Sequence, residues 1–503
     1  MTTLKPQFQL RQIESKSTIA NSRILAASKG KMNIVDGLRI KRAKYLSTLD
    51  PKDKNLINGV KKAAGLPLID FDVAIKKSNL GISNSILKGE WSDPKFHLRN
   101  RLTSLQLFEE LFPWSKELDL LDPNDPRYNF SVLPLPMADK KMSVLLNNLP
   151  SSDYFDYDNT DPYGIFNNTS SILNHRGEII ASRKFPRVLL VNFDELFCPN
   201  GCSGCYKTEA TRENHPVHSN TPKNVISHMK DVSFFLKMHE EVDTMIISGG
   251  EPLLVSNEAL ERMLFEIENI DSLRIVRICT GIVFMGLPMR VDDEMLQILK
   301  NFEKRTGKIV SFHLHLINHE QFTPEAILAT RKIKNMGFVM NAQVPIKEGM
   351  NFFRDDIKKT IDFLKKTVEI CVYCGVDPYK FIVDMHPRTL RHLPPLEILL
   401  SVWSHLSQSG WEKFYGGIKV PRLLNILCRE GNYRLDPLAL LSMDKKFVGG
   451  NMEYTLPTTF SYNHESGISS EKPFTYIEPV MKGYNDNKDS LKKLKKEWSL
   501  QMV

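Results

Sequence analysis

Three cysteines stand close together, at Cys198, Cys202 and Cys205. The spacing C-x3-C-x2-C lets three thiolates bind three irons of one [4Fe–4S] cluster, so the fourth iron is left open for a substrate or a cofactor. A zinc site or three packed thiols are the alternative interpretations. A structural zinc ion prefers four protein ligands, and neither a histidine nor a fourth cysteine follows at close spacing. The pattern therefore favours an iron–sulfur cluster with one open iron.

A second candidate element is Ser248-Gly249-Gly250-Glu251-Pro252-Leu253. Two adjacent glycines at the end of a strand leave backbone groups open to a ligand. The carboxylate of Glu251 can accept hydrogen bonds from an ammonium group. Taken alone, this sequence is typical of a turn. Beside the cysteine motif, it favours a binding role.

Both motifs lie where apolar runs alternate with amphipathic stretches. Strands are predicted at 188–193, 244–248, 274–279, 309–316, 339–346 and 381–384. Helices are predicted between them, at 222–240, 258–267, 291–302, 324–336 and 355–370. Such alternation indicates an α/β fold with a parallel sheet, and the number of units predicts a partial (β/α)6 TIM-like barrel. Chemistry in such barrels occurs at the C-terminal ends of the strands, where both motifs stand.

The remaining regions divide the chain further. The expected parts are a mainly helical N-terminal extension of unknown role (1–88), a helical and irregular wrapping segment (89–186), the barrel (187–390), a mixed C-terminal region (391–480) and a charged helical tail (481–503). Within them, helices are expected at 97–112, 394–408 and 488–496, and irregular structure at 122–187. The lysine-rich tail is interpreted as a solvated helix face.

Composition limits the class of protein. The chain has 503 residues, 42% of them hydrophobic and 25% charged, which is typical of a globular protein. A net charge of +8 with dispersed basic residues does not favour nucleic-acid binding. No run approaches the roughly 18 apolar residues of a membrane helix, and no secretory leader is predicted at the N-terminus. Cysteines that hold a cluster must stay reduced, which predicts the cytoplasm.

Together, the two motifs resemble those of the radical S-adenosylmethionine (SAM) superfamily. From about 89 to 425 the chain resembles the lysine 2,3-aminomutase family in particular. Weak matches occur in the right order at 90–91, 97–101, 122–127, 161–164, 276–278, 288–290, 318–319 and 341–349. The resemblance implies that SAM chelates the open iron and that Gly249, Gly250 and Glu251 help to hold its amino group. Reduction of the cluster would then yield a 5′-deoxyadenosyl radical that abstracts a hydrogen.

The resemblance also implies pyridoxal 5′-phosphate (PLP), held covalently by a lysine that follows a glycine run. Lys419, in the sequence Gly-Gly-Ile-Lys-Val-Pro, matches this position, which makes 391–480 the PLP-contacting region. Arg183 and Arg187 match the arginines that contact the PLP phosphate, a role that suits the forked guanidinium group. The alternative is a glycine turn beside a surface lysine, with two ordinary surface arginines.

Substrate residues follow from the same resemblance. Lys207 stands where the family usually has an arginine that binds the substrate α-carboxylate. The positive charge is kept, but a lysine cannot donate two parallel hydrogen bonds from a planar guanidinium group. Asp384 and Glu412 match acidic residues that hold the distal ammonium in lysine-specific members. A strand-end cap or an ion pair is the alternative for Asp384. The chain from Asp384 to Lys419 is shorter than in the family, which weakens the match of Glu412.

Several positions depart from the family pattern or stand outside it. Ser203, Phe197, Glu251 and Gly281 replace other residues typical of the family, which leaves the radical chemistry intact but bears on the substrate. The remaining cysteines are interpreted as packed thiols. These are Cys279, Cys371, Cys374 and Cys428.

We therefore predict an isomerase, a PLP-dependent radical SAM 2,3-aminomutase that converts L-lysine to a β-amino acid by moving nitrogen from Cα to Cβ. An electron donor such as flavodoxin or ferredoxin is expected as a partner. One alternative is a radical SAM enzyme of the same fold that acts on another small molecule or on a protein-bound lysine, with or without PLP. Another is a non-catalytic iron–sulfur protein. The sequence leaves open whether the chain forms a homo-oligomer, and the stereochemistry of the product.

Overall fold

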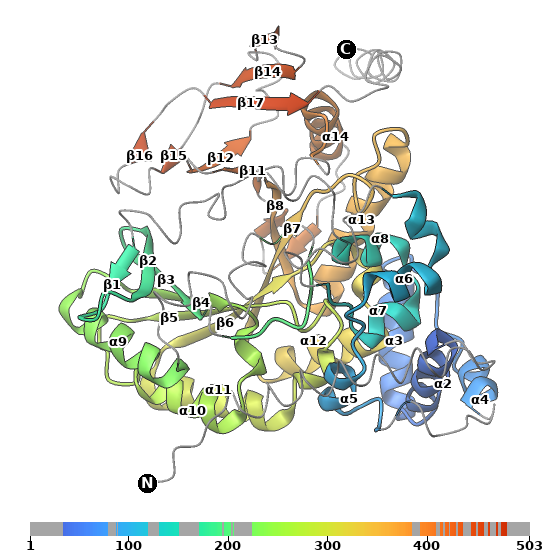
Figure 1. Ribbon diagram of the computed structural model, residues 1–503, viewed down its shortest axis with the longest axis horizontal. Coiled ribbons are helices and arrows are strands. Elements are labelled where there is room, and N and C mark those ends of the chain that lie inside the picture. The colour runs from blue at the N-terminus through green and yellow to red at the C-terminus, as the bar shows by residue number, and fades with distance from the viewer. Residues whose placement is uncertain are drawn as a thin grey trace.

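The computed structural model describes residues 34–78, 87, 89–118, 130–149, 171–193, 196–202, 205, 224–384 and 393–408, and shorter stretches between 413 and 479. The fold is mixed α/β, and its largest sheet has ten strands in the order β1-β2-β3-β4-β5-β6-β7-β8-β11-β12 (Figure 1). The central strands are β3 (Val188–Phe193), β4 (Thr244–Gly249), β5 (Ile275–Thr280), β6 (Ile309–His315), β7 (Val339–Pro345) and β8 (Asp377–Asp384). They are parallel and follow chain order, as predicted.

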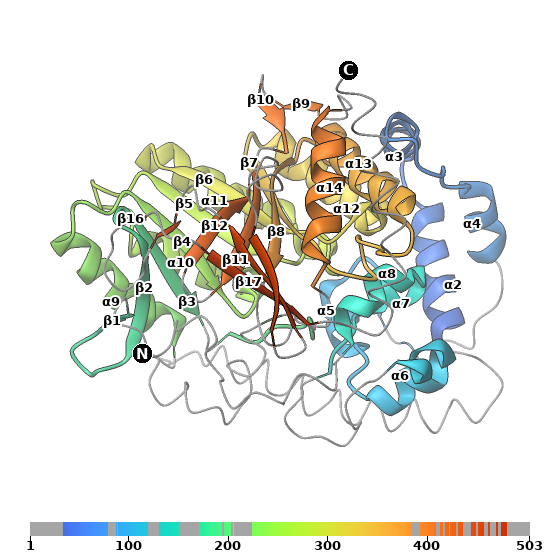
Figure 2. The same ribbon diagram turned by 90° about the horizontal axis from the view of Figure 1, so that it is seen from above.

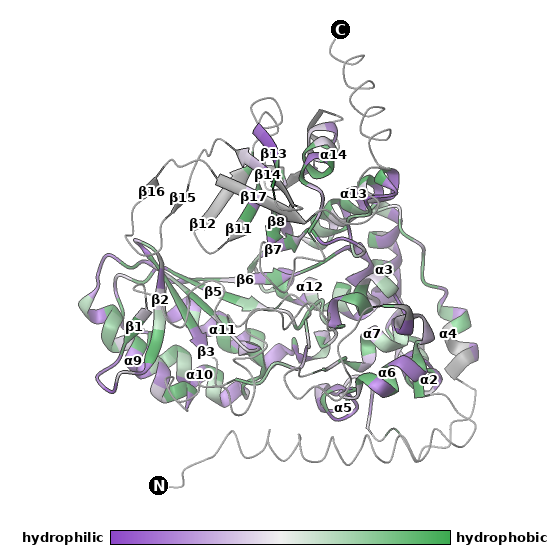
Figure 3. Ribbon diagram, turned by 45° about the horizontal axis from the view of Figure 1, so that its top comes forward, coloured by the Kyte–Doolittle hydropathy of each residue, from purple (hydrophilic) through white to green (hydrophobic). Residues whose placement is uncertain are grey.

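Helices between these strands cover one face of the sheet. They are α9 (Val225–Met238), α10 (Asn257–Phe265), α11 (Asp293–Thr306), α12 (Pro324–Asn335) and α13 (Ile357–Cys374). Each begins after a polar residue whose side chain accepts a backbone N–H of the first turn, namely Asn224, Ser256, Asp292, Thr323 and Asp356. Gly307 and Gly375 end α11 and α13 in the left-handed conformation that favours glycine. The helices carry both hydrophobic and hydrophilic residues (Figure 3), because one side of each contacts the sheet.

The two faces of the sheet differ in polarity. Residues that point toward the helices are apolar and fully buried, among them Val276, Ile278, Phe312 and Ala342. Alternate residues on the same strands point to the other face and are polar and only half-buried. They include Arg277, Cys279, His313, Asn341 and Gln343. We call this second set the inner wall, since period-two alternation places its members on one face.

Two expectations about the region before the sheet were wrong. The stretch 97–112 is not one helix, because α5 (Pro94–Arg99) ends before α6 (Leu105–Leu111), and Leu102 between them forms a β-bridge to Val132. The stretch 122–187 is not irregular throughout. It contains α7 (Pro134–Asp139), α8 (Met142–Leu145), β1 (Ser171–Leu173) and β2 (Ile179–Phe185).

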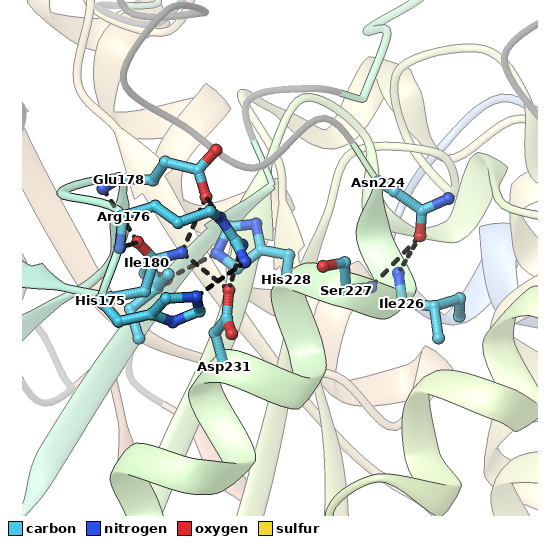
Figure 4. Close-up of polar contacts among 10 residues, drawn as sticks. His175, Arg176, Glu178, Ile180, Asn224, Ile226, Ser227, His228 and Asp231 are labelled. Carbon is cyan, nitrogen blue, oxygen red and sulfur yellow. Dashed lines mark hydrogen bonds and ion pairs between the residues drawn. The ribbon is translucent and has the colours of Figure 1, made fainter.

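The β1–β2 hairpin extends the sheet on the side of β3 and is fastened to α9 (Figure 4). The Arg176 guanidinium donates to Glu178 within the hairpin and to Asp231 on α9, at 2.8 Å each. His228 of α9 contacts the carbonyl oxygen of Ile180 through its Nε2, at 2.7 Å. These contacts hold β2 in place. Because β2 is the neighbour of β3 in the sheet, they also help to position β3, the strand that leads into the cysteine loop.

The N-terminal helices α2 (Ile34–Ser47), α3 (Pro51–Ala63) and α4 (Phe71–Ser78) lie at the opposite end of the molecule from this hairpin (Figure 2). The Arg42 guanidinium of α2 binds both carboxylate oxygens of Glu325, at 2.8 and 3.0 Å, and Asp139 at 2.7 Å. Burial alone would raise the pKa of Glu325, but the charge and hydrogen bonds of Arg42 lower it overall. A buried bidentate ion pair therefore joins α2 to the first turn of α12.

The C-terminal region contains the predicted helix, α14 (Leu396–Gln408), and strands that were not predicted. These are β9 (Lys413–Tyr415), β10 (Ile418–Val420), β11 (Leu423–Cys428), β12 (Gly431–Leu435), β13 (Asp444–Val448), β14 (Asn451–Leu456), β15 (Ser461–Tyr462), β16 (Ser469–Ser470) and β17 (Phe474–Pro479). Strand β11 adds to the main sheet parallel to β8. The expected tail helix 488–496 lies outside the described residues, and no described helix could span a membrane.

Candidate active site at the C-terminal ends of the strands

The cysteine loop follows β3 and is held by the segment that contains α7 and α8. The amide of Gly201 donates to the carbonyl oxygen of Ser131 at 3.0 Å. The Ser131 hydroxyl in turn donates to the carbonyl oxygen of Pro199 at 2.7 Å. Within the loop, the amide of Cys205 donates to the carbonyl oxygen of Cys202 at 3.1 Å. The loop thus has defined backbone contacts on the side of the wrapping segment.

The three thiols influence one another. Burial and the neighbouring thiols Cys202 and Cys205 raise the pKa of Cys198 well above its usual value. Burial, followed by the charge of Cys205, raises the pKa of Cys202 to about 12. Three thiolates in such a place need a compensating positive charge, and metal binding supplies it by displacing the thiol protons. The donor set therefore fits a metal-based group.

The zinc alternative requires ligands that converge on one metal ion. Among the described residues, no three His, Cys, Asp or Glu side chains are grouped as ligands of one metal ion. A [4Fe–4S] cluster places its thiolates on separate irons and does not require them to converge on one point. The assignment of the three cysteines to such a cluster remains a prediction.

The Gly-Gly-Glu turn after β4 packs directly on the cysteine loop. The amide of Gly250 donates to the carbonyl oxygen of Phe193, and the amide of Glu251 to that of Phe197, both at 3.2 Å. A Cβ on Gly249 would lie 2.4 Å from the Phe193 oxygen, and one on Gly250 would lie 2.0 Å from the Leu196 oxygen. Gly249 also has a φ of +126°. The close approach of two backbones thus requires both glycines, a reason that sequence analysis missed.

The carboxyl group of Glu251 is buried and joins the ends of β4 and β5. The Thr280 hydroxyl donates to Glu251 at 2.6 Å and the Gly281 amide at 2.8 Å. Burial raises the pKa of Glu251 to about 7, although these hydrogen bonds act in the opposite direction. Glu251 therefore fixes the shape of the turn, while contact with the SAM amino group remains a prediction.

Lys347, in the loop after β7, belongs to the stretch 341–349 that resembles the family, and it lies beside the cysteine loop. It is 4% exposed, and its Nζ donates to Oδ1 of Asn147 at 3.2 Å. Burial lowers the pKa of Lys347, whereas Cys202 and Cys205 act in the opposite direction. Within the described part of the chain no carboxylate forms an ion pair with this ammonium group. Its burial beside the cysteines could not be read from the sequence.

The two arginines predicted to contact a phosphate lie elsewhere. Arg183 forms an ion pair with Glu241 at 2.9 Å, and Arg187 forms one with Asp243 at 2.5 Å. Arg187 directly precedes the first residue of β3, whereas Cys198 follows the last. The structure therefore places these arginines at the edge where the strands begin and does not bring them to the cysteine loop.

The other predicted site residues are placed only in part. Asp384 ends β8, where burial raises the pKa of its carboxyl group to about 7. Lys419 lies on β10 opposite Phe414 of β9, but its side chain lies outside the described part. Lys207 and Glu412 lie outside the described residues.

The other cysteines differ in their surroundings. Cys371 and Cys374 are buried near the end of α13, where burial raises the pKa of each, that of Cys374 to about 12. They fit the interpretation as packed thiols. Cys279 departs from it, because it is half-buried on the inner wall rather than in the core. The side chain of Cys428 lies outside the described residues.

Comparison with known proteins agrees with this geometry. Residues 193–304 match the family model of a 4Fe-4S single cluster domain. An L-lysine 2,3-aminomutase of Fusobacterium nucleatum is 23% identical over 406 residues, which cover 76% of this chain and 86% of that protein. A glutamate 2,3-aminomutase of Clostridioides difficile is 23% identical over 278 residues, which cover 53% of this chain and 61% of that protein.

These findings support the lysine 2,3-aminomutase family of radical SAM proteins. The family resemblance is low in identity and uneven in coverage. A relative from Aquifex aeolicus, for example, is 26% identical over 198 residues, and the chain spans about half of its length, 49%. The similarity to this family thus agrees with the cysteine loop, while activity and substrate need separate arguments.

Proposed function

We propose that this chain is a radical SAM aminomutase, an isomerase that moves the amino group of an amino acid from Cα to Cβ with the help of PLP. One observation carries the proposal. The C-x3-C-x2-C loop and the Gly-Gly-Glu turn follow adjacent parallel strands and are joined by backbone hydrogen bonds. Similarity to lysine and glutamate aminomutases supports the reaction class.

The cofactors of the proposal are a [4Fe–4S] cluster, SAM and PLP. Cys198, Cys202 and Cys205 would hold the cluster, and the residues around Gly250 would contact SAM. When bound and reduced, the cluster and SAM supply the radical that removes a hydrogen from the substrate. The order of the parallel strands β3 to β8 supports a partial barrel, in which these loops share one end.

The chain's own residues would hold PLP and the substrate. Strand β10, which carries Lys419, lies next to β8, which ends at Asp384. Lys419 would carry PLP, and Lys207 would bind the α-carboxylate. A carboxyl group whose pKa is raised by burial gains from a nearby cation, so Asp384 favours a substrate with a distal ammonium. L-lysine is therefore the proposed substrate, with Glu412 as a second acidic contact.

The test is anaerobic incubation with SAM, PLP, dithionite and either L-lysine or L-glutamate, with 5′-deoxyadenosine and β-amino acids measured. The expected result is a β-amino product from lysine. Deoxyadenosine without such a product would overturn the aminomutase assignment in favour of another radical SAM reaction. An intact cluster that never cleaves SAM would indicate a non-catalytic iron–sulfur protein. A cytoplasmic location and a flavodoxin or ferredoxin as electron donor belong to the same proposal.

A further inference from the structure

A buried asparagine of the wrapping segment lies beside the cysteine loop. Asn147 belongs to the short 3₁₀ helix η2 (Leu146–Asn148), which follows α8, and it is fully buried. Cys202 packs against a small apolar cluster that includes Met285, and the Nδ2 of Asn147 lies 3.7 Å from the sulfur of Met285. The carboxamide of Asn147 is therefore placed where one of the predicted cluster ligands meets its apolar surroundings.

Lys347 determines how this carboxamide is oriented. Its Nζ donates to Oδ1 of Asn147 at 3.2 Å, and an ammonium group can only donate hydrogen bonds. The oxygen of Asn147 must therefore face Lys347, and the two N–H groups on Nδ2 point away from it. The contact of Nδ2 with Met285 is to a thioether sulfur, which is a weak acceptor. A thiolate sulfur would be a much stronger acceptor for the same nitrogen.

Such a sulfur is supplied by Cys202. Burial, followed by the charge of Cys205, raises the pKa of Cys202. The charge of Lys347, followed by a hydrogen bond from the Asn147 side chain, acts in the opposite direction. Nδ2 carries the only donors of the Asn147 side chain, so this bond is of the type N–H···S. It favours the thiolate form of Cys202, which is the form that binds a metal.

The carboxamide and the lysine are each held by buried contacts. Next to the carboxamide, Asn148 donates through Nδ2 to the carbonyl oxygen of Ser131 at 3.3 Å, and the same oxygen accepts the amide of Gly201. The amide of Lys347 donates to Oδ1 of Asn351 at 2.8 Å, while Nδ2 of Asn351 donates to the carbonyl oxygens on either side. The donor therefore meets the sulfur in a fixed geometry, so little reorganisation is needed when the charge at the site changes.

We propose that Asn147 is a positioning residue of the iron–sulfur site, whose amide donates to the sulfur of Cys202 and makes a bound cluster easier to reduce. Hydrogen bonds to the sulfurs help to set the reduction potential of such clusters, because they stabilise the additional negative charge of the reduced state. Lys347 holds the amide in this orientation through its oxygen. The proposal rests on the cluster of the proposed function, but not on PLP or on the substrate.

The experiment is a potentiometric titration of the reconstituted full-length protein without SAM, followed by electron paramagnetic resonance. Asn147→Leu replaces the carboxamide by an apolar group of the same branched shape, and Asn147→Ala is the smaller alternative if leucine prevents folding. Both variants are neutral, so neither adds a charge near the cluster. Leu146→Met is the matched control, because Leu146 packs against the same apolar cluster as Cys202 and has no polar group. Iron analysis and thermal unfolding check that each variant is loaded and folded.

The expected result is that the ratio of reduced to oxidised cluster at a fixed potential falls about threefold or more in the Asn147 variants, while Leu146→Met keeps the wild-type ratio. An unchanged ratio in a loaded Asn147 variant, or an equal fall in Leu146→Met, would overturn the inference. A wild type that takes up no cluster would overturn it together with the proposed function. The expected shift in a protein that forms no β-amino acid would overturn the aminomutase alone and support the role of Asn147.

Discussion

The amide nitrogen of Glu251 donates to the carbonyl oxygen of Phe197 at 3.2 Å, and this bond joins the turn after β4 to the residue before the first cysteine. Two motifs that are far apart in the sequence are thus one structural unit. The position of the cysteine loop depends on the backbone of the turn, and not only on the thiols. The first prediction follows from this dependence.

Replacing Gly250 by alanine should displace the cysteine loop, because the new Cβ would meet the Leu196 carbonyl oxygen at 2.0 Å. We expect a loss of bound iron and at least tenfold weaker SAM binding, measured by iron and sulfide analysis and by equilibrium binding. Gly59→Ala in α3 is the control, since nothing lies within 4 Å of its Cβ. The control should stabilise the protein by about 0.5–1 kcal/mol. Normal iron content and SAM affinity in Gly250→Ala would refute this account.

Single replacement of Cys202 by serine should abolish the assembly of a complete cluster, because a three-cysteine site has no spare thiolate. Iron content and the electron paramagnetic resonance signal of the reduced protein would measure the effect. Cys371→Ala is the control, since this buried thiol belongs to the hydrophobic core. A control that loses its cluster as fully as Cys202→Ser would argue against the assignment.

Lys347 should make the cluster easier to reduce, because its buried ammonium favours the more negative, reduced state. Replacement by methionine keeps the apolar stem and removes the charge. In Lys347→Met we expect the ratio of reduced to oxidised cluster at a fixed potential to fall about tenfold. This change equals a decrease of about 59 mV in the midpoint potential for one electron. A potentiometric titration would measure it, with Lys347→Arg as the charge-preserving control. Equal potentials for Lys347→Met and wild type would disprove the electrostatic role.

Asp384 should cause stability to decrease with rising pH. Burial raises the pKa of its carboxyl group from 3.8 to about 7, so the folded state keeps a proton that the unfolded state has lost above pH 4. Folded stability therefore falls as pH rises toward 7. Asp384→Asn should remove this pH dependence. Its free energy of unfolding relative to wild type should be higher at pH 8 than at pH 5, by on the order of 2 kcal/mol. Urea unfolding at both values tests this, and a parallel pH dependence of the two proteins would contradict it.

Replacing only one partner of the ion pair between Arg42 and Glu325 should strongly destabilise the folded protein. Arg42→Met leaves the Glu325 carboxylate buried without its partner, which should lower the free energy of unfolding by about 3–5 kcal/mol. Arg39→Ala on the same helix is the control, because its ion pair with Asp36 is exposed. The control should change stability by less than about 0.5 kcal/mol. Denaturant unfolding that shows similar losses for both variants would contradict the expected difference.

The central strands were predictable because each is a short apolar run between amphipathic helices with clear polar caps. The break between α5 and α6 was not predictable from the sequence. It depends on the β-bridge from Leu102 to Val132, a contact between segments that are distant along the chain. The position of Arg187 could have been inferred, because a residue before a strand lies at the edge away from the strand's end. The burial of Lys347 beside the cysteines could not have been inferred, because it depends on how the loops after several strands fold against one another.

The buried contact between α2 and α12 also constrains how this chain can vary. A descendant that lost α2 would keep the buried carboxylate of Glu325 but lose its main counter-charge, Arg42. Loss of α2 would therefore have to be accompanied by substitution of Glu325. Arg42 and Glu325 should therefore be inherited or replaced together. Helix α2 is in this sense not a detachable addition, since its sequence is tied to that of α12, one of the helices that cover the sheet.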